Sequence, residues 1–128
     1  MPRVVHFEIH ADKPERAIAF YRGLFGWSIE KFGDQPYWLI KTGESGSPGI
    51  DGGLMPRRGP RPTDGQPMNG FPCTVDVPNL DASLEKATAT GGRVVVPKMG
   101  VANVGWLAFC VDTEGNIFGM MQNDPNAH

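Results

Sequence analysis

Polar and apolar side chains alternate strictly at the start of the chain, in the stretch HFEIHA. His6, Glu8 and His10 take every second position, and Phe7 and Ile9 lie between them. Successive side chains of a β-strand point to opposite faces, so this pattern predicts a strand with one polar and one apolar face. The two imidazoles and the carboxylate would then share the polar face.

A helical pattern follows the first strand. Apolar residues recur three and four positions apart from Ala17 onward, and Gly26 ends the pattern. Asp12 lies just before this helix with Glu15 three positions later, which predicts a capping box. Three short apolar stretches, WSIEKF, YWLIKT and GIDGGLM, then predict three strands separated by turn-forming residues.

The same order of elements returns 66 residues later. Residues 6–29 align without a gap on residues 72–95, and GLM at 53–55 aligns on GMM at 119–121. We therefore expect a single domain, 1–128, of α+β class with two tandem βαβββ modules. Module one would cover residues 3–55, a Pro/Gly-rich crossover residues 56–69, and module two residues 70–123.

Composition narrows the function classes. The net charge of -2 and the pI near 5.9 give no electrostatic reason to expect nucleic acid as a partner. The one basic cluster, RRGPRP at 57–62, is rich in proline and glycine and predicts a solvated loop. No stretch has the pattern of a signal peptide or a membrane span. Cys73 and Cys110 lie in apolar runs, so we expect buried, reduced thiols and a cytoplasmic protein.

Two motifs carry a resemblance to a known family. The first is F-Y-x-x-x-x-G at the end of the predicted helix (Phe20, Tyr21, Gly26), and the second is the D-x-x-G-N turn before the last strand, residues 112–116. With the doubled module, they resemble the vicinal oxygen chelate superfamily of glyoxalases, extradiol dioxygenases and bleomycin-resistance proteins. The resemblance implies a curved mixed sheet that forms a barrel-like cleft, with the helices outside. It also implies a homodimer and a divalent metal in the cleft.

The residues at the family's metal-ligand positions are unusual. The resemblance places these ligands at His6, Gly53, Pro72 and Gly119, and only His6 has a side chain that can bind a metal. Divalent sites of this type need about three protein ligands. We therefore predict that the usual metal centre is lost and that the protein has no cofactor. A noncanonical centre built from the polar face of the first strand remains an alternative.

Strand parity predicts which side chains surround these positions. The polar face of the first strand would form a pocket wall that orients a ligand or acts as general acid and base. A self-contained ion pair of Glu8 with a histidine or an arginine is the competing interpretation. Two tryptophans would add flat walls, with core packing or a subunit contact as their alternative role. The predicted pocket comprises His6, Glu8, His10, Trp38, Asp51, Gly53, Met55, Thr74, Trp106, Gly119 and Met121.

Two functions remain open from the sequence. The first is a protein that binds a small molecule in its cleft without the usual metal, acting as a homodimer without nucleic acid or membrane partners. The second is a lyase, isomerase or dioxygenase of the glyoxalase type. It would use an unusual metal site, or acid/base chemistry with Glu8 and His10 as the catalytic candidates.

Overall fold

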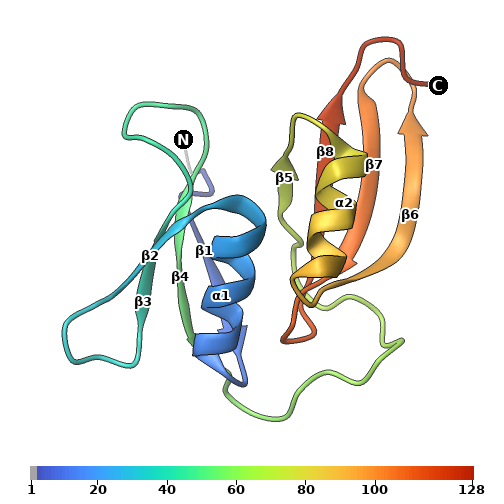
Figure 1. The fold of residues 1–128 in the computed structure, drawn as a ribbon. Helices are drawn as coiled ribbons and strands as arrows, with labels where there is room; N and C mark the ends of the chain where they lie inside the picture. Colours follow the sequence, from blue (N-terminus) through green and yellow to red (C-terminus); the bar gives the residue numbers. More distant parts are fainter. Residues whose placement is uncertain (1–2) are drawn as a thin grey trace. The chain divides into compact units, whose positions relative to one another are not determined.

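The chain folds into two compact units. The computed structural model describes residues 3–128, and the chain divides into the two units between Arg61 and Pro62. Each unit contains one α-helix and one four-stranded mixed sheet (Figure 1). This confirms the α+β class and the two βαβββ modules; we call the first unit module one and the second module two. That their sheets together form a barrel-like cleft, within a single domain, stays a prediction.

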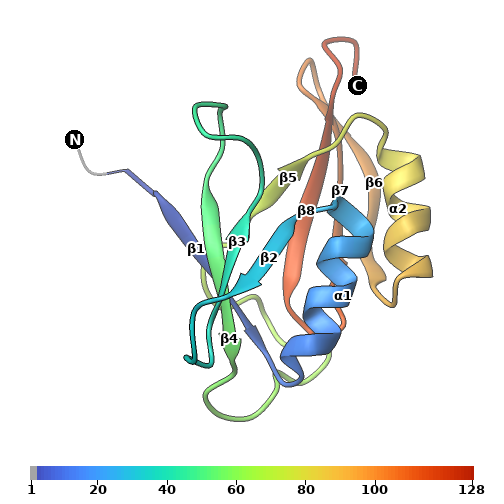
Figure 2. The same cartoon turned by 60° about the vertical axis from the view of Figure 1, so that its left-hand side comes forward.

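Module one begins with the strand that the alternating pattern predicts. Its parallel partner is the last strand of the module, and the sheet order is β1-β4-β3-β2 (Figure 2). The other two strand pairs are antiparallel. The elements are β1 (His6–Ala11), α1 (Pro14–Phe25), β2 (Ser28–Lys31), β3 (Trp38–Lys41) and β4 (Asp51–Pro56).

Helix α1 covers one face of this sheet. Its side chains Ala17, Phe20 and Leu24 are buried, as are Ile40 and Leu54 on the sheet. Because side chains alternate along each strand, burying this set leaves the opposite set on the other face. The polar residues of β1 therefore lie on the face without the helix.

The predicted capping box is wrong. Lys13 is the N-cap residue of α1 and makes no side-chain capping bond, while a proline at the first turn supplies a preset helical φ. The Asp12 carboxylate instead accepts a hydrogen bond from Arg57 Nε at 3.0 Å and pairs with Arg61 at 3.5 Å. Arg57 is only 10% exposed, so the basic cluster is anchored here rather than fully solvated.

Module two repeats the arrangement, with a shorter first strand and three longer strands after its helix. Its sheet order is β5-β8-β7-β6, with β5 parallel to β8, and α2 packs on one face (Figure 1). Asn79 caps α2, because its side chain accepts a hydrogen bond from the backbone N–H of Ala82 at 3.0 Å. The elements are β5 (Thr74–Asp76), α2 (Leu80–Ala89), β6 (Arg93–Val101), β7 (Gly105–Val111) and β8 (Ile117–Asn123).

Strand register confirms the internal repeat. In module one Glu8 is paired with Gly53, and in module two Thr74 is paired with Gly119. Each member of the second pair lies 66 positions after its counterpart, which is the offset seen in the sequence. The two glycines therefore occupy equivalent places in the two sheets.

The cysteines differ in exposure. Cys110 is fully buried, as predicted, and burial raises the pKa of its thiol. Cys73 is exposed, and it directly precedes the short edge strand β5. The prediction of two buried thiols is thus wrong for Cys73. Within residues 3–128 no helix combines the length and the apolar character that crossing a membrane requires.

Candidate functional site

The face of the module-one sheet opposite α1 carries most of the predicted site residues of that module. We call it the open face. Register places His6 beside Asp51, Glu8 beside Gly53, and His10 beside Met55. Leu39 of β3 lies on the other side of Gly53 and is 44% exposed. The predicted neighbours on β1 and β4 therefore do share one face.

The centre of the open face is occupied by Tyr37. Its hydroxyl donates to Glu8, with both carboxylate oxygens at 3.0 Å, and lies 3.0 Å from His6 Nε2. His6 Nε2 is also 3.6 Å from Glu8 Oε1. We call these three side chains the Tyr37–Glu8–His6 cluster. The contact between His6 and Glu8 matches the competing interpretation from the sequence, a pair of Glu8 with a histidine. Tyr37 is a third member that this interpretation did not include.

Gly53 makes room for the cluster. A Cβ atom built on Gly53 would lie 1.8 Å from the Tyr37 hydroxyl oxygen, 2.2 Å from Tyr37 Cζ and 2.8 Å from Glu8 Oε2. Such distances are far below van der Waals contact. The missing side chain at Gly53 is therefore replaced in space by the phenol of Tyr37.

The electrostatics of the cluster fix its hydrogen-bond direction. Partial burial raises the pKa of Tyr37, and the hydrogen bond to Glu8 and the charge of Glu8 raise it further. The hydroxyl is thus protonated at neutral pH and acts as the donor to the carboxylate. The side chains of His6 and Glu8 are 46% and 39% exposed, so the cluster is accessible to solvent.

Tyr37 was not among the residues predicted for the site, although strand parity indicates its position. Tyr37 immediately precedes Trp38, so the two side chains point to opposite faces of β3. Trp38 is paired with Leu54, which is fully buried on the helix side of the sheet. The structure therefore places Trp38 on the face opposite to His6, and its neighbour Tyr37 on the open face.

Trp106 of module two also lies on the helix side of its sheet. It is paired with Gln122 and follows the parity of the buried Ala108. Its indole Nε1 donates to Asp124 Oδ2 at 3.0 Å, and this bond is the largest cause of the lowered pKa of Asp124. The two tryptophans predicted as pocket walls therefore lie on the opposite face of the sheet from the glycine of their module: Trp38 from Gly53, and Trp106 from Gly119.

Gly119 is covered by side chains of its own module. Thr74 and Met121 share its face, as predicted, and Phe109 of β7 is its cross-strand partner. A Cβ atom on Gly119 would lie 3.1 Å from Thr74 Oγ1 and 3.2 Å from the Phe109 ring. An aromatic ring and a hydroxyl, rather than a ligating side chain, fill this position.

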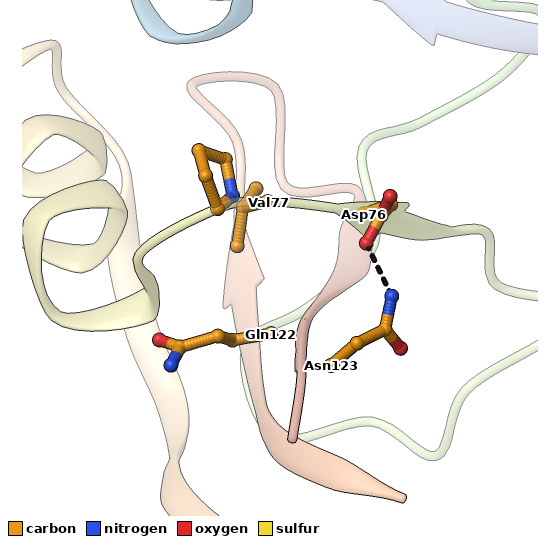
Figure 3. Close-up of a pocket in the computed structure, with 5 residues that line it drawn as sticks. Asp76, Val77, Gln122 and Asn123 are labelled. Atoms are coloured by element: carbon orange, nitrogen blue, oxygen red, sulfur yellow. Dashed lines mark hydrogen bonds between the residues drawn. The ribbon is translucent and has the colours of Figure 1, made fainter. Parts of the chain in front are cut away.

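A shallow hollow of about 290 Å³ lies where β5 leads into α2 (Figure 3). Asn123 Nδ2 donates to Asp76 Oδ1 at 3.0 Å across it, and Gln122 Oε1 accepts from the backbone N–H of Leu80 at 2.8 Å. These bonds tie β8 to β5 and to the start of α2. The polar groups of this hollow therefore serve the local fold.

The residues at the four expected ligand positions do not fit a metal centre. Gly53, Pro72 and Gly119 have no side-chain donor atom, and His6 Nε2 already contacts Tyr37 and Glu8. Across residues 3–128, no three His, Cys, Asp or Glu side chains gather in a way that could hold a metal ion. No metal-dependent step follows from this donor set.

Comparisons with known proteins agree with the fold. The sequence profile of the Glyoxalase/Bleomycin resistance protein/Dioxygenase superfamily matches residues 3–119. Two curated mycobacterial proteins, from Mycobacterium bovis and Mycobacterium tuberculosis, both named "Putative glyoxylase CFP32", are 31% identical to the chain over 121 residues. That match covers 92% of this chain but 43% of the relatives, so the chain spans less than half of their length.

Solved structures share the architecture at low identity. A glyoxalase/bleomycin resistance protein/dioxygenase family enzyme from Burkholderia phytofirmans has a TM-score of 0.72 and 16% identity, covering 93% of this chain and 97% of its own. A glyoxalase-related enzyme from Fulvimarina pelagi has a TM-score of 0.70 and 16% identity, covering 100% and 98%. At this identity the likeness concerns the fold alone.

Proposed function

The chain belongs to the glyoxalase/bleomycin resistance protein/dioxygenase superfamily, and on that premise we propose that it binds a small molecule on the open face of module one without the family's usual metal centre. One observation carries this proposal. The phenol of Tyr37 fills the space above Gly53, where the resemblance expects a metal ligand, and it hydrogen-bonds the remaining imidazole, His6.

The composition of the open face suits a small ligand. Binding sites combine apolar walls with a few convergent polar groups. Leu39 and Met55 supply apolar surface, and the Tyr37–Glu8–His6 cluster supplies the polar groups. Asp51 is less available, because its Oδ1 accepts a hydrogen bond from the backbone N–H of Thr42 at 2.8 Å.

The alternative is an enzyme of the glyoxalase type, a lyase, isomerase or dioxygenase. The name of the two mycobacterial relatives favours it, although the chain spans only 43% of their length. Acid/base chemistry would fall to Glu8 and His10, which share the open face. Against this role, both carboxylate oxygens of Glu8 are engaged by Tyr37.

A homodimer is part of the same proposal. β1 is an edge strand in the sheet of module one, and Val4 and Val5 just before it are 75% and 76% exposed. Exposed edges of this kind are available for pairing with a second chain. Light scattering coupled to size-exclusion chromatography would give twice the chain mass for a dimer; a single-chain mass at micromolar concentration would contradict it.

Binding and catalysis are separated by three assays on untagged protein. We expect no stoichiometric metal by mass spectrometry, and backbone amide shifts on β1, β3 and β4 when small polar fragments are titrated. We also expect no turnover of the methylglyoxal–glutathione hemithioacetal. Turnover that His6→Ala or Glu8→Gln abolishes would overturn the binding proposal and establish the enzyme in its place. Fragment-induced shifts confined to α1 would place the ligand elsewhere.

A further inference from the structure

Tyr37 contacts the open face as a ligand would. Its oxygen gives one hydrogen bond to a carboxylate and lies within hydrogen-bond distance of an imidazole nitrogen. It rests against the backbone of Gly53, where any side chain would collide with it. The protein thus holds, within its own chain, a hydroxyl group on a flat ring at the centre of the candidate site.

The backbone around Tyr37 does not depend on this contact. The N–H of Tyr37 donates to the Gln35 carbonyl at 2.8 Å, and its carbonyl accepts from the N–H of Phe32 at 2.9 Å. Both bonds belong to the β2–β3 connection and persist whichever rotamer the side chain adopts. A rotation about the side-chain torsions is therefore sufficient to move the phenol away from Gly53.

The partners of the phenol tolerate its departure. His6 and Glu8 are each more than one-third exposed, so water can replace the hydrogen bonds that they lose. The remaining aromatic contact of Tyr37 is an edge-on one with Phe32, at 6.5 Å between ring centroids, and Phe32 is itself 54% exposed. The phenol is held by interactions that a ligand of modest affinity can match.

The chemistry of the vacated space favours one kind of group. Glu8 requires a hydrogen-bond donor and repels an anion, which excludes a carboxylate or a phosphate. His6 Nε2 donates or accepts according to its tautomer, and a protonated His6 would repel an ammonium group. A neutral hydroxyl both donates and accepts, so it satisfies Glu8 together with either form of His6.

We propose that the space above Gly53 is a subsite for a neutral hydroxyl group of the bound small molecule, and that Tyr37 is its displaceable occupant. This inference rests on the proposed function and names the chemistry of its ligand. Tyr37 competes with the ligand, so the free protein has the subsite filled and the bound protein has the phenol rotated away. The apparent affinity of the ligand is its intrinsic affinity multiplied by the fraction of chains in which Tyr37 does not block the subsite.

Chemical replacement of the tyrosine side chain tests the subsite directly. We would measure the affinity of p-cresol, which is the side chain of tyrosine as a free molecule, for wild type, Tyr37→Ala and Tyr37→Val. 4-Methylanisole, which has the same ring but cannot donate, and p-toluate, which is anionic, are the matched controls. We expect both variants to bind p-cresol about tenfold more tightly than wild type does. We expect both variants to bind p-cresol about tenfold more tightly than they bind 4-methylanisole. Both variants should bind p-toluate most weakly of the three.

A second variant identifies the partner of the hydroxyl. In the double variant Tyr37→Ala/Glu8→Ala, the preference for p-cresol over 4-methylanisole should fall to about onefold. In wild type, p-cresol at high concentration should shift the Cζ carbon resonance of Tyr37 toward its value in the Glu8→Ala variant. This readout needs no truncation of Tyr37, so it serves if the truncated variants fail to fold.

Three results would overturn the subsite. They are equal binding of p-cresol and its methyl ether, equal binding of p-cresol by wild type and both variants, and a Tyr37 resonance that does not move while p-cresol binds. The outcome is independent of the metal and turnover assays. A protein that turns over the hemithioacetal can still have the hydroxyl subsite, and a binding protein can lack it.

Discussion

A single methyl group at Gly53 tests how the open face is built. Gly53→Ala places a carbon 1.8 Å from the Tyr37 hydroxyl oxygen, so the phenol must leave its position. The backbone of Gly53 is outside the left-handed region, which means that alanine fits there without backbone strain. The atoms in the way belong to the far ends of the Tyr37 and Glu8 side chains, and these can rotate.

The expected loss of stability is small. Expelling the phenol removes its hydrogen bonds to Glu8 and His6, and each such bond contributes about 0.5–1.5 kcal/mol. Solvent exposure of both partners keeps the sum near the lower end, at about 1 kcal/mol. Replacing glycine by alanine returns about 0.4–1 kcal/mol through the unfolded chain. The net destabilisation should therefore lie between about 0 and 0.6 kcal/mol.

The neighbouring glycine provides a matched control. A Cβ atom on Gly52 would lie 2.5 Å from the backbone carbonyl oxygen of Phe7 and 2.6 Å from its ring, on the helix side of the sheet. Backbone cannot rotate away as a side-chain end can, so overpacking here should cost about 2–3 kcal/mol. The two variants differ by one position in the chain and by the face that they perturb.

Urea unfolding and the pKa of Tyr37 measure the two consequences. For Gly53→Ala we expect a near-wild-type free energy of unfolding. We also expect a Tyr37 pKa that returns toward its usual value near 10, because the phenol leaves its partly buried position and Glu8 no longer contacts the hydroxyl. For Gly52→Ala we expect a large loss of stability without that change in pKa. Equal destabilisation by both variants, or an unchanged Tyr37 pKa in Gly53→Ala, would refute the placement of the phenol.

Three further predictions concern other parts of the molecule. Asn79→Ala should lower the free energy of unfolding by about 1 kcal/mol in urea titrations, because it removes the side-chain cap of α2. A thiol reagent should label Cys73 rapidly and Cys110 only after unfolding, and one fast equivalent in a Cys73→Ser variant would contradict this. The raised pKa of Tyr37 implies stability that is fully present below about pH 10 and lost as the pH rises through the folded-state pKa. Tyr37→Phe should therefore lose less stability than wild type over that alkaline range, and an identical loss would contradict the contact.

Periodicity predicted the fold because the repeat and the strand parity are properties of the sequence. The offset of 66 residues identified Gly53 and Gly119 as equivalents, and the register of the two sheets agrees. Parity also placed the three polar residues of β1 on one face. These features depend on local spacing, which any folded strand of that length must follow.

The centre of the site was not predicted, because it depends on a contact between distant segments. Tyr37 reaches Glu8 across 29 positions of sequence, and no local pattern marks that pairing. Trp38 was the aromatic residue predicted for the pocket wall; its side chain lies on the helix side of the sheet, whereas the Tyr37 hydroxyl lies against Gly53 on the open face. Asp12 is a second example. Local spacing predicted that its carboxylate caps α1, but the carboxylate pairs instead with Arg57 and Arg61, which lie 45 and 49 positions away in the sequence.

The proposal that module one lacks the usual metal centre is tested most directly by whether the His6 imidazole binds an added metal ion. Nitrogen-15 NMR of the histidine side chains, recorded while Zn²⁺ is titrated to excess, reports on His6 Nε2 itself, with His6→Ala to assign the resonance. We expect the His6 Nε2 and Tyr37 Cζ resonances to stay in place, because the imidazole remains against the phenol. A stoichiometric shift of His6 Nε2 to the zinc-bound value, with release of Tyr37, would contradict it and restore a metal centre to the open face.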